Sequence, residues 1–573
     1  MNYKTPGVYV EEQEKFPPSV AQVETAIPAF IGYTAEGTKN KPTRISSMLE
    51  YETLFGKANP EVFAVAFKDG VATATQTKVS DFKMYYAMQM YFANGGGPCY
   101  IVSVGDYSGL VTVGTSTTVG TLLYGLELLK KEDEPTLIVF PDLQGLVPST
   151  ADVATAQAAA QVADSNKIAA TAAKDAAKAV TDVVAGANVD AAVDAAVAKA
   201  ITYIVNDPNN AQIAAAQAAQ AVVDAVKVAA VVNNATVTTV KAAAQVVADA
   251  FNTDLTTVTT IATAATAAKS LAVSRAGDAA GISLTYSLYN KALDQAELLK
   301  DRFVIMDVLG DDVTFRKEVV ATGLNYGAAY HPKLKTVLSY DFKDADILVT
   351  GASGITNLAA LKLASSELYN QAKKAIASKQ VVMAPSSSMA GVYAKVDSTS
   401  GVFKAPANLG LNFVEAPIVK ISDREQDALN VDPTSGKSIN AIRTFTGKGT
   451  LVWGARTLDG NSNEWRYVSV RRFFNMVEES VKKSTERFVF EPNTANTWIR
   501  VQTMIENFLN QQWQDGALAG SKPEEAYYVS VGLNKTMSAQ DILEGRMVIE
   551  VGMAAVRPAE FIVLRFSHKL QEA

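Results

Sequence analysis

The sequence predicts a multidomain protein of mixed α/β and α+β class that carries an Ala-rich helical insertion. The chain has 573 residues, which is long for one domain and suggests three or four folded units. Hydrophobic residues make up 48% and charged residues 19% of it, as in proteins that form packed cores. Ala dominates residues 151–280, whereas both flanks are rich in aromatic residues and alternate strand-like with helix-like segments.

The first strand-like segment lies close to the N-terminus. Phe16-Pro17-Pro18 separates this segment, Gly7–Glu12, from the next candidate strand, Ala26–Tyr33. A lone terminal strand on a Pro-containing tether cannot form a sheet by itself. It must pair with its own domain or with the exposed edge of a neighbour, and strand addition is an established mode of assembly. Farther along, Gly95-Gly96-Gly97 follows an apparent helix and predicts a tight turn into the apolar strand Cys99–Val104.

The middle of the chain has an α/β pattern. Thr136–Phe140 is a short apolar run that ends at Pro141, as a buried strand would. After the insertion, Tyr289–Arg302 has helical periodicity and Phe303–Val308 is a second buried strand. Strand, helix and strand in this order predict a parallel βαβ unit with a right-handed crossover. Further strands are expected at Lys335–Ser339, Ile347–Val349 and Val381–Ala384.

The insertion itself is expected to be helical, because Ala has the highest helix propensity. Asp207-Pro208 and Asn233-Asn234 predict breaks, so we expect short helices that pack through small residues. The segment lies in a loop of the α/β domain, where added length lowers stability only slowly. A surface insertion without a separate activity is the favoured interpretation.

The C-terminal third predicts two amphipathic helices and three strands. Val468–Glu486 runs from a strand-like start into a helix with Phe473, Val477 and Val481 on one face. A second helix begins near Asn493-Thr494, a plausible N-cap, and ends before Gly516. The three strands expected after it are Tyr527–Leu533, Arg546–Met553 and Glu560–Ser567.

The residue inventory offers no convincing active site. A net charge of −7 argues against non-specific nucleic-acid binding, and a single cysteine, Cys99, excludes an internal disulfide framework. The two histidines, His331 and His568, leave little for histidine catalysis or a histidine metal site. No catalytic residue, cofactor site or metal site is therefore predicted.

Two segments are faintly similar to catalytic motifs. Ser386–Ala390 is similar to the segment around the serine of subtilisin-like proteases, but neither histidine has the setting that a triad needs; a turn serine with its hydrogen bonds satisfied is the better interpretation. Thr434–Ser438 ends like a phosphate-binding loop, yet Val431 stands where the first glycine belongs. It is more simply a polar turn.

No segment predicts export or membrane insertion. The N-terminus lacks the basic start and apolar core of a signal peptide. The most continuously non-polar stretch, around 211–232, is interrupted by Asp224 and Lys227 and is not expected to span a membrane. We expect the chain to be made and assembled in a cytoplasm.

A set of motifs spread over both ends of the chain points to a family. The strongest are Val452–Leu458 (VWGARTL), Trp465–Phe473 and Phe490-Glu491-Pro492-Asn493. The others are Thr5–Glu12, Ala26–Thr34, Phe92–Gly96, Cys99–Val104, Met389–Asp397, Val402–Asn408, Gly516–Gly520, Pro523–Glu525 and Val556–Phe561. With these motifs the chain resembles the sheath proteins of contractile tails, which include those of contractile phages, R-type pyocins and phage-tail-like extracellular injection systems. The resemblance covers roughly everything except 151–280.

The resemblance implies a domain plan. The middle domain would have a subtilisin-like α/β fold without a protease triad, and a mixed α+β inner domain would exchange its terminal strands with neighbours. The implied limits are 1–20 for an N-terminal arm, 21–105 for the N-terminal part of the inner domain, 106–150 with 281–395 for the middle domain, 151–280 for an outer insertion, 396–556 for the tube-facing C-terminal part of the inner domain, and 557–573 for a C-terminal arm.

The resemblance also implies a structural role without enzymatic activity or a cofactor. Copies would stack as hexameric rings into a helical sheath around an inner tube, and contraction would drive the tube through a target envelope. Implied partners are other copies of the chain, the inner tube protein, and baseplate and tail-terminator or cap proteins. Neither nucleic acid nor direct membrane insertion is implied. Assembly would take place in a bacterial cytoplasm, and the product would be part of a released extracellular particle or a virion tail.

Two sets of residues are implied to make contacts between chains. The terminal arms would add strands to neighbouring subunits, with arm residues Tyr3, Gly7, Val8, Tyr9, Val10, Glu11, Phe561, Ile562, Val563, Leu564, Arg565 and Phe566. The C-terminal domain would face acidic residues of the tube through the cations Arg471, Arg472, Lys482, Lys483 and Arg487. The competing interpretation is local pairing, since Glu478/Lys482 and Glu479/Lys483 are spaced i,i+4 on the predicted helix.

Alternatives to this function stay open at the level of sequence. An extracellular injection system is preferred within the family, because the run from Thr5 to Thr34 is more similar to that branch; a contractile phage tail is the alternative. Outside the family, the remote alternatives are a subtilisin-like hydrolase and a non-contractile surface polymer with the insertion as its binding module.

Overall fold

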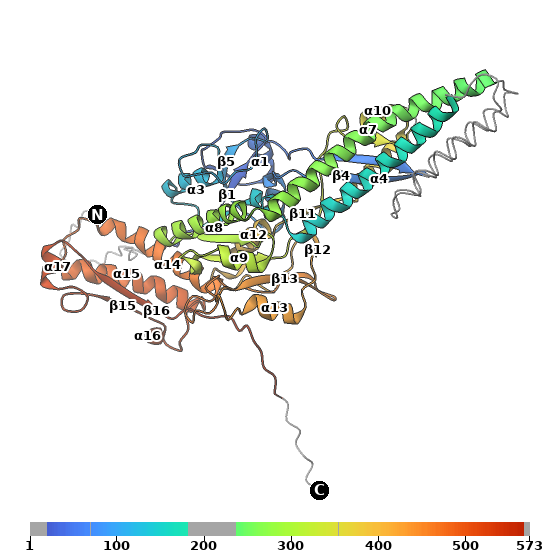
Figure 1. Ribbon diagram of the computed structural model, residues 1–573. Helices are drawn as coiled ribbons and strands as arrows, with labels where there is room; N and C mark the ends of the chain where they lie inside the picture. Colours follow the sequence, from blue (N-terminus) through green and yellow to red (C-terminus); the bar gives the residue numbers. More distant parts are fainter. Residues whose placement is uncertain (1–19, 69, 182–236, 353–354, 566–573) are drawn as a thin grey trace, which may run out of the picture.

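The computed structural model describes residues 20–68, 70–181, 237–352 and 355–565. Its shape is elongated (Figure 1): a body of sheets and helices lies in the middle, a long helical hairpin projects at one end, and a smaller unit of helices with a strand pair lies at the other. The structure thus has the mixed α/β and α+β, multidomain character that the sequence predicts.

The centre of the described chain is an eight-stranded sheet of order β14-β13-β8-β7-β6-β1-β5-β2. Neighbouring strands are parallel from β5 to β13, and antiparallel pairs close both edges. The strands are β1 (Pro28–Tyr33), β2 (Thr43–Ile45), β5 (Cys99–Gly105), β6 (Leu137–Val139), β7 (Phe303–Asp307), β8 (Gly327–His331), β13 (Ile439–Phe445) and β14 (Gly449–Val452).

Helices cover both faces of this sheet. Alternate residues of its apolar strands point to opposite faces, so both faces carry apolar side chains that the helices bury. Ile31 and Met306 lie in one core together with Leu293 of helix α8. Phe30 and Ile305 lie in another core together with Met389 of helix α12. The covering helices are α3 (Leu122–Leu128) and α8 (Ala279–Leu299) on one face, and α2 (Met84–Ala93) and α12 (Ser386–Ser400) on the other.

The predicted parallel unit is confirmed: β6 and β7 pair in parallel and α8 precedes β7. The tight turn after α2 into β5 is also confirmed, and Cys99 is buried as a small apolar residue. The domain limit expected at residue 105 falls inside one sheet, since β1 pairs with both β5 and β6.

The three further strands form as expected, although outside the central sheet. In the described chain, β9 (Leu334–Ser339) lies between β11 (Gln380–Met383) and β12 (Val414–Pro417), and β10 (Leu348–Thr350) pairs with β3 (Val62–Lys68), which pairs in turn with β4 (Val71–Lys78). Short helices connect these strands: α1 (Met48–Phe55), α9 (Asp312–Glu318), α10 (Leu358–Ala364), α11 (Ser366–Ala377) and α13 (Asp423–Asn430), and 3₁₀ turns at Leu129–Lys131, Pro141–Gly145 and Leu324–Tyr326.

The insertion is a pair of long helices, so the expectation of short ones is wrong in the described part. Helices α4 (Thr150–Thr181) and α7 (Val237–Gly277) have 32 and 41 residues, because no Pro interrupts either of them and Ala sustains the helix. Small residues do pack between them, including Ala160, Ala163 and Ala262. The expected breaks at Asp207-Pro208 and Asn233-Asn234 lie outside the described residues.

The base of this hairpin is fixed to the body. Its Ala cluster packs on Ala64 of β3. Asp152, in the first turn of α4, accepts a hydrogen bond from Lys333 Nζ at 2.7 Å. Arg275, in the last turn of α7, donates to both carboxylate oxygens of Asp81, at 2.9 and 2.7 Å. Asp278 alone separates α7 from α8, so the hairpin continues directly into a helix of the central layer.

The C-terminal unit consists of α14 (Val468–Thr485), α15 (Ala495–Gln514) and the antiparallel pair β15 (Tyr527–Val531) and β16 (Ile549–Met553), with α16 (Pro523–Ala526), α17 (Ala539–Leu543) and a 3₁₀ turn at Glu486–Phe488. Phe473 and Val477 pack against Val501 and Ile505 in its core. The strand-like start expected at Val468 is wrong: α14 begins there because its first turn is buried in tertiary contacts that override strand propensity.

The remaining expectations for this region are met in part. Helix α15 begins after Thr494, as expected, but the Thr494 side chain makes no capping hydrogen bond. The first two strands are confirmed as β15 and β16. The third, Glu560–Ser567, is not a strand in its described part, because residues 560–565 have no partner strand in the described chain. No helix of the described residues is long and apolar enough to span a membrane.

Candidate assembly surfaces and the root of the C-terminal segment

The C-terminal segment leaves the body as an extended chain (Figure 1). Phe561, Ile562, Val563 and Leu564 are 71%, 80%, 76% and 72% exposed, and Arg565 is exposed too. A run of exposed apolar side chains is unfavourable in water, so this segment has the chemistry of a surface that another chain covers. Phe566 lies outside the described residues, as do Tyr3, Gly7, Val8, Tyr9, Val10 and Glu11.

The pair β15–β16 offers an acceptor for such a segment. Within the described residues these two strands pair only with each other, so each keeps one edge of unpaired N–H and C=O groups. A two-stranded sheet is marginal in water, and added strands stabilise it.

Glu560, directly before the exposed run, is held tightly. Arg456 approaches the carboxylate with Nε 2.9 Å from Oε1 and Nη2 2.7 Å from Oε2. Asn430 Nδ2 donates to Oε1 at 2.9 Å, and the Tyr467 hydroxyl donates to Oε2 at 3.1 Å. Burial disfavours the charged form of Glu560, but the hydrogen bonds from Arg456, Asn430 and Tyr467 outweigh it and lower the pKa of this carboxyl.

Arg456 is itself locked into the body. Its side chain is 5% exposed, and its Nη1 donates to the Asn430 carbonyl at 3.2 Å. Its backbone N–H donates to Asn440 Oδ1 at 2.8 Å, and its carbonyl accepts from Asn440 Nδ2 at 2.8 Å. Because Asn440 also donates to the Ala329 carbonyl, the contacts of Arg456 reach β13 and β8 of the central sheet.

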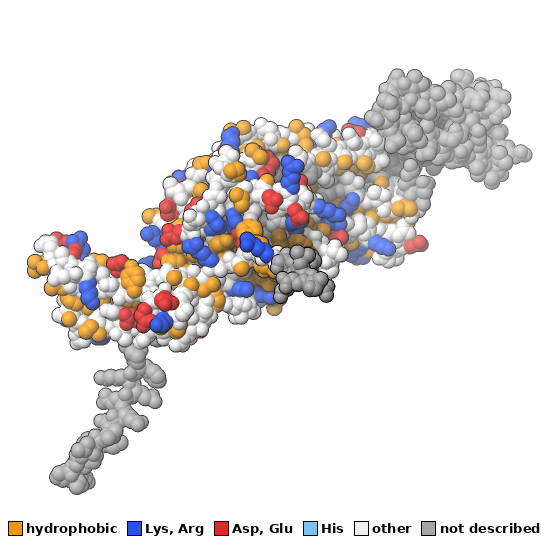
Figure 2. Space-filling view, turned by 90° about the horizontal axis from the view of Figure 1, so that it is seen from below, with side chains coloured by type: hydrophobic (Ala, Val, Ile, Leu, Met, Phe, Trp, Pro, Cys, Tyr) orange, Lys and Arg blue, Asp and Glu red, His pale blue; other side chains and the backbone are white. Residues whose placement is uncertain are grey.

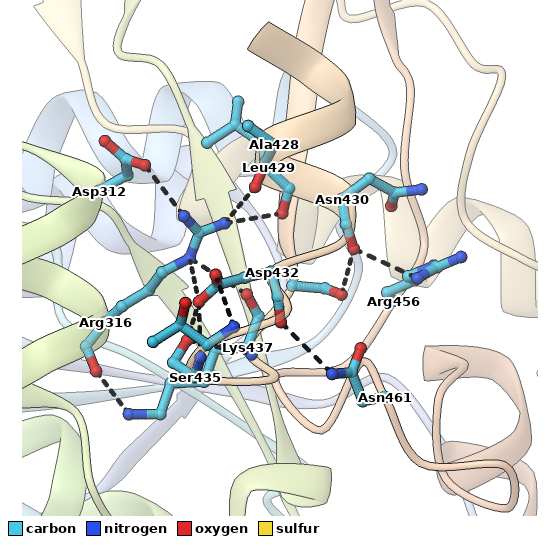
Figure 3. Close-up of polar contacts among 12 residues, drawn as sticks. Asp312, Arg316, Ala428, Leu429, Asn430, Asp432, Ser435, Lys437, Arg456 and Asn461 are labelled. Atoms are coloured by element: carbon cyan, nitrogen blue, oxygen red, sulfur yellow. Dashed lines mark hydrogen bonds and ion pairs between the residues drawn. The ribbon is translucent and has the colours of Figure 1, made fainter. Parts of the chain in front are cut away.

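A second arginine, Arg316, stabilises the region around the end of α13, where Asn430 contacts Arg456 (Figure 3). Arg316 of α9 donates to the carbonyls of Ala428 and Leu429, at 2.8 and 3.0 Å, and so satisfies the last turn of α13. Lys437 donates its Nζ to the Arg316 carbonyl. The segment Thr434–Ser438 is therefore the polar turn that the sequence predicts: Asp432 accepts the N–H groups of Thr434 and Ser435.

Sequence reasoning missed Arg456 and Glu560 as a site, although it quoted both inside motifs. Arg456 belongs to VWGARTL and Glu560 to VRPAEF. Arg456 is the one charged residue of its segment, and Glu560 shares its segment with Arg557; the other residues of both segments are mostly small or apolar, and charged residues in such surroundings are usually paired when buried. That pattern could have suggested the contact.

Two of the predicted tube-facing cations are buried. Arg472 has a 3% exposed side chain and pairs with Asp397, with Nη1 3.0 Å from Oδ1; its guanidinium also lies 4.6 Å from the centre of the Tyr393 ring. Arg471 is 4% exposed, and its Nη2 donates to Glu478 Oε1 at 2.9 Å. Both guanidinium groups are thus engaged within the chain.

The other three cations are more accessible. Lys482 and Lys483 both pair with Glu479, at 3.1 and 3.4 Å, and are 63% and 38% exposed. The i,i+4 pair Glu479/Lys483 therefore forms, whereas Glu478 pairs with Arg471 and not with Lys482. Arg487 is exposed and lies over the Phe488 ring. On the face seen in Figure 2, cationic and anionic side chains are interspersed.

The serine segment is structural. Ser386 begins α12 and is buried. Its Oγ donates to Asp307 Oδ2 at 2.6 Å and its N–H donates to Oδ1 at 2.8 Å, so its hydrogen bonds are satisfied as expected, at a helix start and not in a turn. Among the described residues, no group of three His, Cys, Asp or Glu side chains could hold a metal ion.

Comparisons with known proteins agree with these features. A family model described as the phage tail sheath C-terminal domain matches residues 461–569. The tail sheath protein of Enterobacteria phage T4 is 25% identical over 121 residues, which are 21% of this chain and 18% of that protein. The match thus spans less than a fifth of this curated relative.

Solved structures match over nearly the whole chain. A chain of the anti-feeding prophage helical sheath in the contracted state has 25% identity and a TM-score of 0.52, with 99% of this chain and 100% of that chain covered. A chain of the anti-feeding prophage baseplate has 25% identity and a TM-score of 0.53 over the same shares. The contracted PVC sheath complex, from an extracellular contractile injection system, shares the fold at 24% identity and a TM-score of 0.52, with 100% and 99% covered. Residues 461–569 thus match the C-terminal domain of phage tail sheath proteins, and the chain as a whole is similar in fold to contractile sheath proteins.

Proposed function

We propose that the protein is the sheath subunit of an extracellular contractile injection system. The observation that carries this proposal is the match to the anti-feeding prophage sheath over 99% of this chain. Copies stack as hexameric rings around an inner tube, and baseplate and cap proteins bound the sheath. The phage T4 relative, matched only in part, keeps a contractile phage tail as the alternative. Particles released with a capsid attached would favour that alternative.

The domain plan carries over to this proposal. Residues 106–150 with 281–395, which supply β6, β7 and β8 of the central sheet, serve as the subtilisin-like middle domain, and residues 396–556, which include α14, α15 and β15–β16, face the tube. The α4–α7 hairpin is the outer insertion: it projects from the body (Figure 1), and its base contacts the body through the ion pairs of Arg275 with Asp81 and of Asp152 with Lys333 and through a small apolar cluster.

The terminal arms join neighbouring subunits. The exposed run Phe561–Arg565 and the N-terminal arm residues, Tyr3 and Gly7–Glu11, add as strands to the free edges of β15 and β16 in other copies. Main-chain hydrogen bonds suit this task, because they keep subunits connected while rigid domains change their packing. Contraction needs no nucleotide if assembly traps the extended state and the contracted state buries more surface.

Deleting residues 561–573 should abolish sheath polymers and leave a folded monomer, because the described part of this segment has no backbone hydrogen bonds within the chain. Electron microscopy of the purified protein should show ribbed hollow cylinders for the full chain and none for the deletion, with equal thermal unfolding of the monomers. Deleting residues 1–12 should have the same effect. Normal cylinders from both deletions would contradict the proposal.

A proline scan gives a matched control in the same segment. In an added strand, alternate residues direct their N–H groups to the partner strand. Proline at 561 to 565 in turn should therefore impair assembly at every second position, since proline removes an N–H donor.

The cations Lys482 and Arg487 are proposed to meet acidic residues of the tube. Reversing both, K482E with R487E, should reduce co-sedimentation of sheath with tube protein severalfold at low salt and change monomer stability by about 0.5 kcal/mol or less, as for surface sites. K535E, which reverses an exposed lysine in the loop after β15, is the control and should bind like the parent. Equal co-sedimentation of all three proteins would exclude an electrostatic contact at these residues.

A further inference from the structure

The C-terminal segment has a single firm point of attachment near its exposed run. The last backbone hydrogen bond that the described tail makes joins Val556 N to the Ala517 carbonyl at 3.1 Å. Beyond Val556, the polar contacts of the described tail are those of the Glu560 carboxylate. The exposed apolar run begins at the next residue.

We infer that the ion pair of Arg456 with Glu560 is the root of the C-terminal arm: it fixes where and in which direction the arm leaves the subunit, and it transmits a pull on the arm into the central sheet. This inference rests on the proposed function, in which the arm joins neighbouring subunits. Arg456 and Glu560 would thus act as positioning residues for assembly.

Three elements meet at the Glu560 carboxylate. Asn430 is the last residue of α13, Arg456 follows β14, and Tyr467 directly precedes α14. The first two belong to the body and the third begins the C-terminal unit, so Glu560 is held at the junction of the two. Asn440 then connects the Arg456 backbone to the central sheet through Ala329. A force on the arm therefore reaches β13 and β8 through side chains that are buried or half-buried.

The chemistry of the pair suits a fixed direction. The guanidinium meets both carboxylate oxygens, and such a two-point contact defines orientation as well as distance. Lysine carries the same charge but cannot reproduce this fork. The partner left buried after removal of one member would be an unpaired charge, which is strongly disfavoured.

Losing the contact lengthens the free tether. The fixed point would retreat from Glu560 to Val556, which adds four residues and about 13–14 Å of extended chain at about 3.3–3.6 Å per residue. Slack of this size lowers the effective concentration of the arm at a neighbour's sheet edge. Assembly should then require more protein even though every arm residue is intact.

The test uses the full chain with spin labels at Ala559→Cys and Lys448→Cys, two exposed positions; the native Cys99 is buried. Pulsed electron resonance on the monomer should give a narrow distance distribution for the parent and a clearly broader one for E560Q and R456K. The control E550Q, which alters an exposed carboxylate bonded to Tyr528, should leave the distribution narrow. In unlabelled protein, E560Q and R456K should raise the concentration needed for cylinders about tenfold.

The two readouts separate this inference from the proposed function. If the distance distribution is unbroadened in both E560Q and R456K, the inference that the Arg456–Glu560 pair fixes the start of the arm is wrong. Assembly of both variants at the parent concentration would also contradict it. If E560Q fails to fold, R456K and the milder Y467F carry the same comparison. Cylinders from the 561–573 deletion would instead overturn the arm's role in assembly, while the distance measurement on the monomer would still decide whether the pair holds the segment.

Discussion

Replacing Arg472 with methionine is expected to lower the free energy of unfolding by about 3–5 kcal/mol, because the change leaves the Asp397 carboxylate buried without its partner. The Asp397 side chain is 6% exposed. The substitution also removes the hydrogen bond from Arg472 to the Thr25 carbonyl at 2.9 Å and the stacking on Tyr393. These contacts connect the start of the described chain, α12 and α14. Their loss should therefore destabilise the packing of all three segments and not of α14 alone.

Denaturation in urea measures the effect, and a double substitution supplies the control. R472M with D397N removes both charges and should recover much of the loss, since a neutral pair carries no unpaired charge. K482M, which removes an exposed lysine of the same helix, should change stability by about 0.5 kcal/mol or less. If R472M were no more destabilising than K482M, the stabilising role assigned to the buried pair of Arg472 with Asp397 would be wrong.

The second large effect concerns Asp307 and pH. Burial raises the pKa of Asp307 to about 7, against the opposing effect of the hydrogen bonds from Ser386. The unfolded value is near 3.9, so the folded state holds this proton more tightly. The stability that protonated Asp307 contributes is therefore complete below about pH 4, declines as the pH rises, and is lost above about pH 7.

D307N should abolish this dependence. An asparagine can accept the Ser386 N–H and donate to its Oγ, so it imitates the protonated acid. We expect equal stability of D307N and parent near pH 4, and a more stable D307N at pH 8 by a few kcal/mol. Urea midpoints between pH 4 and 8 check this. Asp142, another buried carboxyl with a pKa raised to about 7 by burial, is present in both proteins and cancels in the comparison. Parallel pH profiles for the two proteins would contradict the assignment.

The sequence predicted those parts of the fold in which local pattern and tertiary environment agree. Strand β6 is apolar throughout, and β7 is apolar up to its last residue, Asp307, because both faces of the central sheet are buried. Helix α15 shows an apolar stripe because it buries only one side, whereas the first turn of α14 is buried on all sides. Pairings between distant strands, such as β13 with β8, leave no local signal, since more than a hundred residues separate them.

The candidate site was predicted less well for a similar reason. Residue type shows that Arg472 and Arg456 are charged, but not which partner folds against them. Their carboxylates, Asp397 and Glu560, lie 75 and 104 residues away in the chain. Exposure of the C-terminal run could be predicted, because an isolated terminal strand needs a partner from another chain. The contact of Glu560 with Arg456 directly before that run could not be predicted.

The hairpin of α4 and α7 converts rotation into displacement. A helix of 41 residues is about 60 Å long at about 1.5 Å per residue. Since Asp152 and Arg275 fix its base and α7 leads straight into α8, the hairpin turns with the body. A turn of about 10° then sweeps the outer end of α7 through about 10 Å, by the same helix length. A small rotation of the body, which moves atoms near the centre only slightly, therefore moves the outer end of the hairpin by a much larger distance.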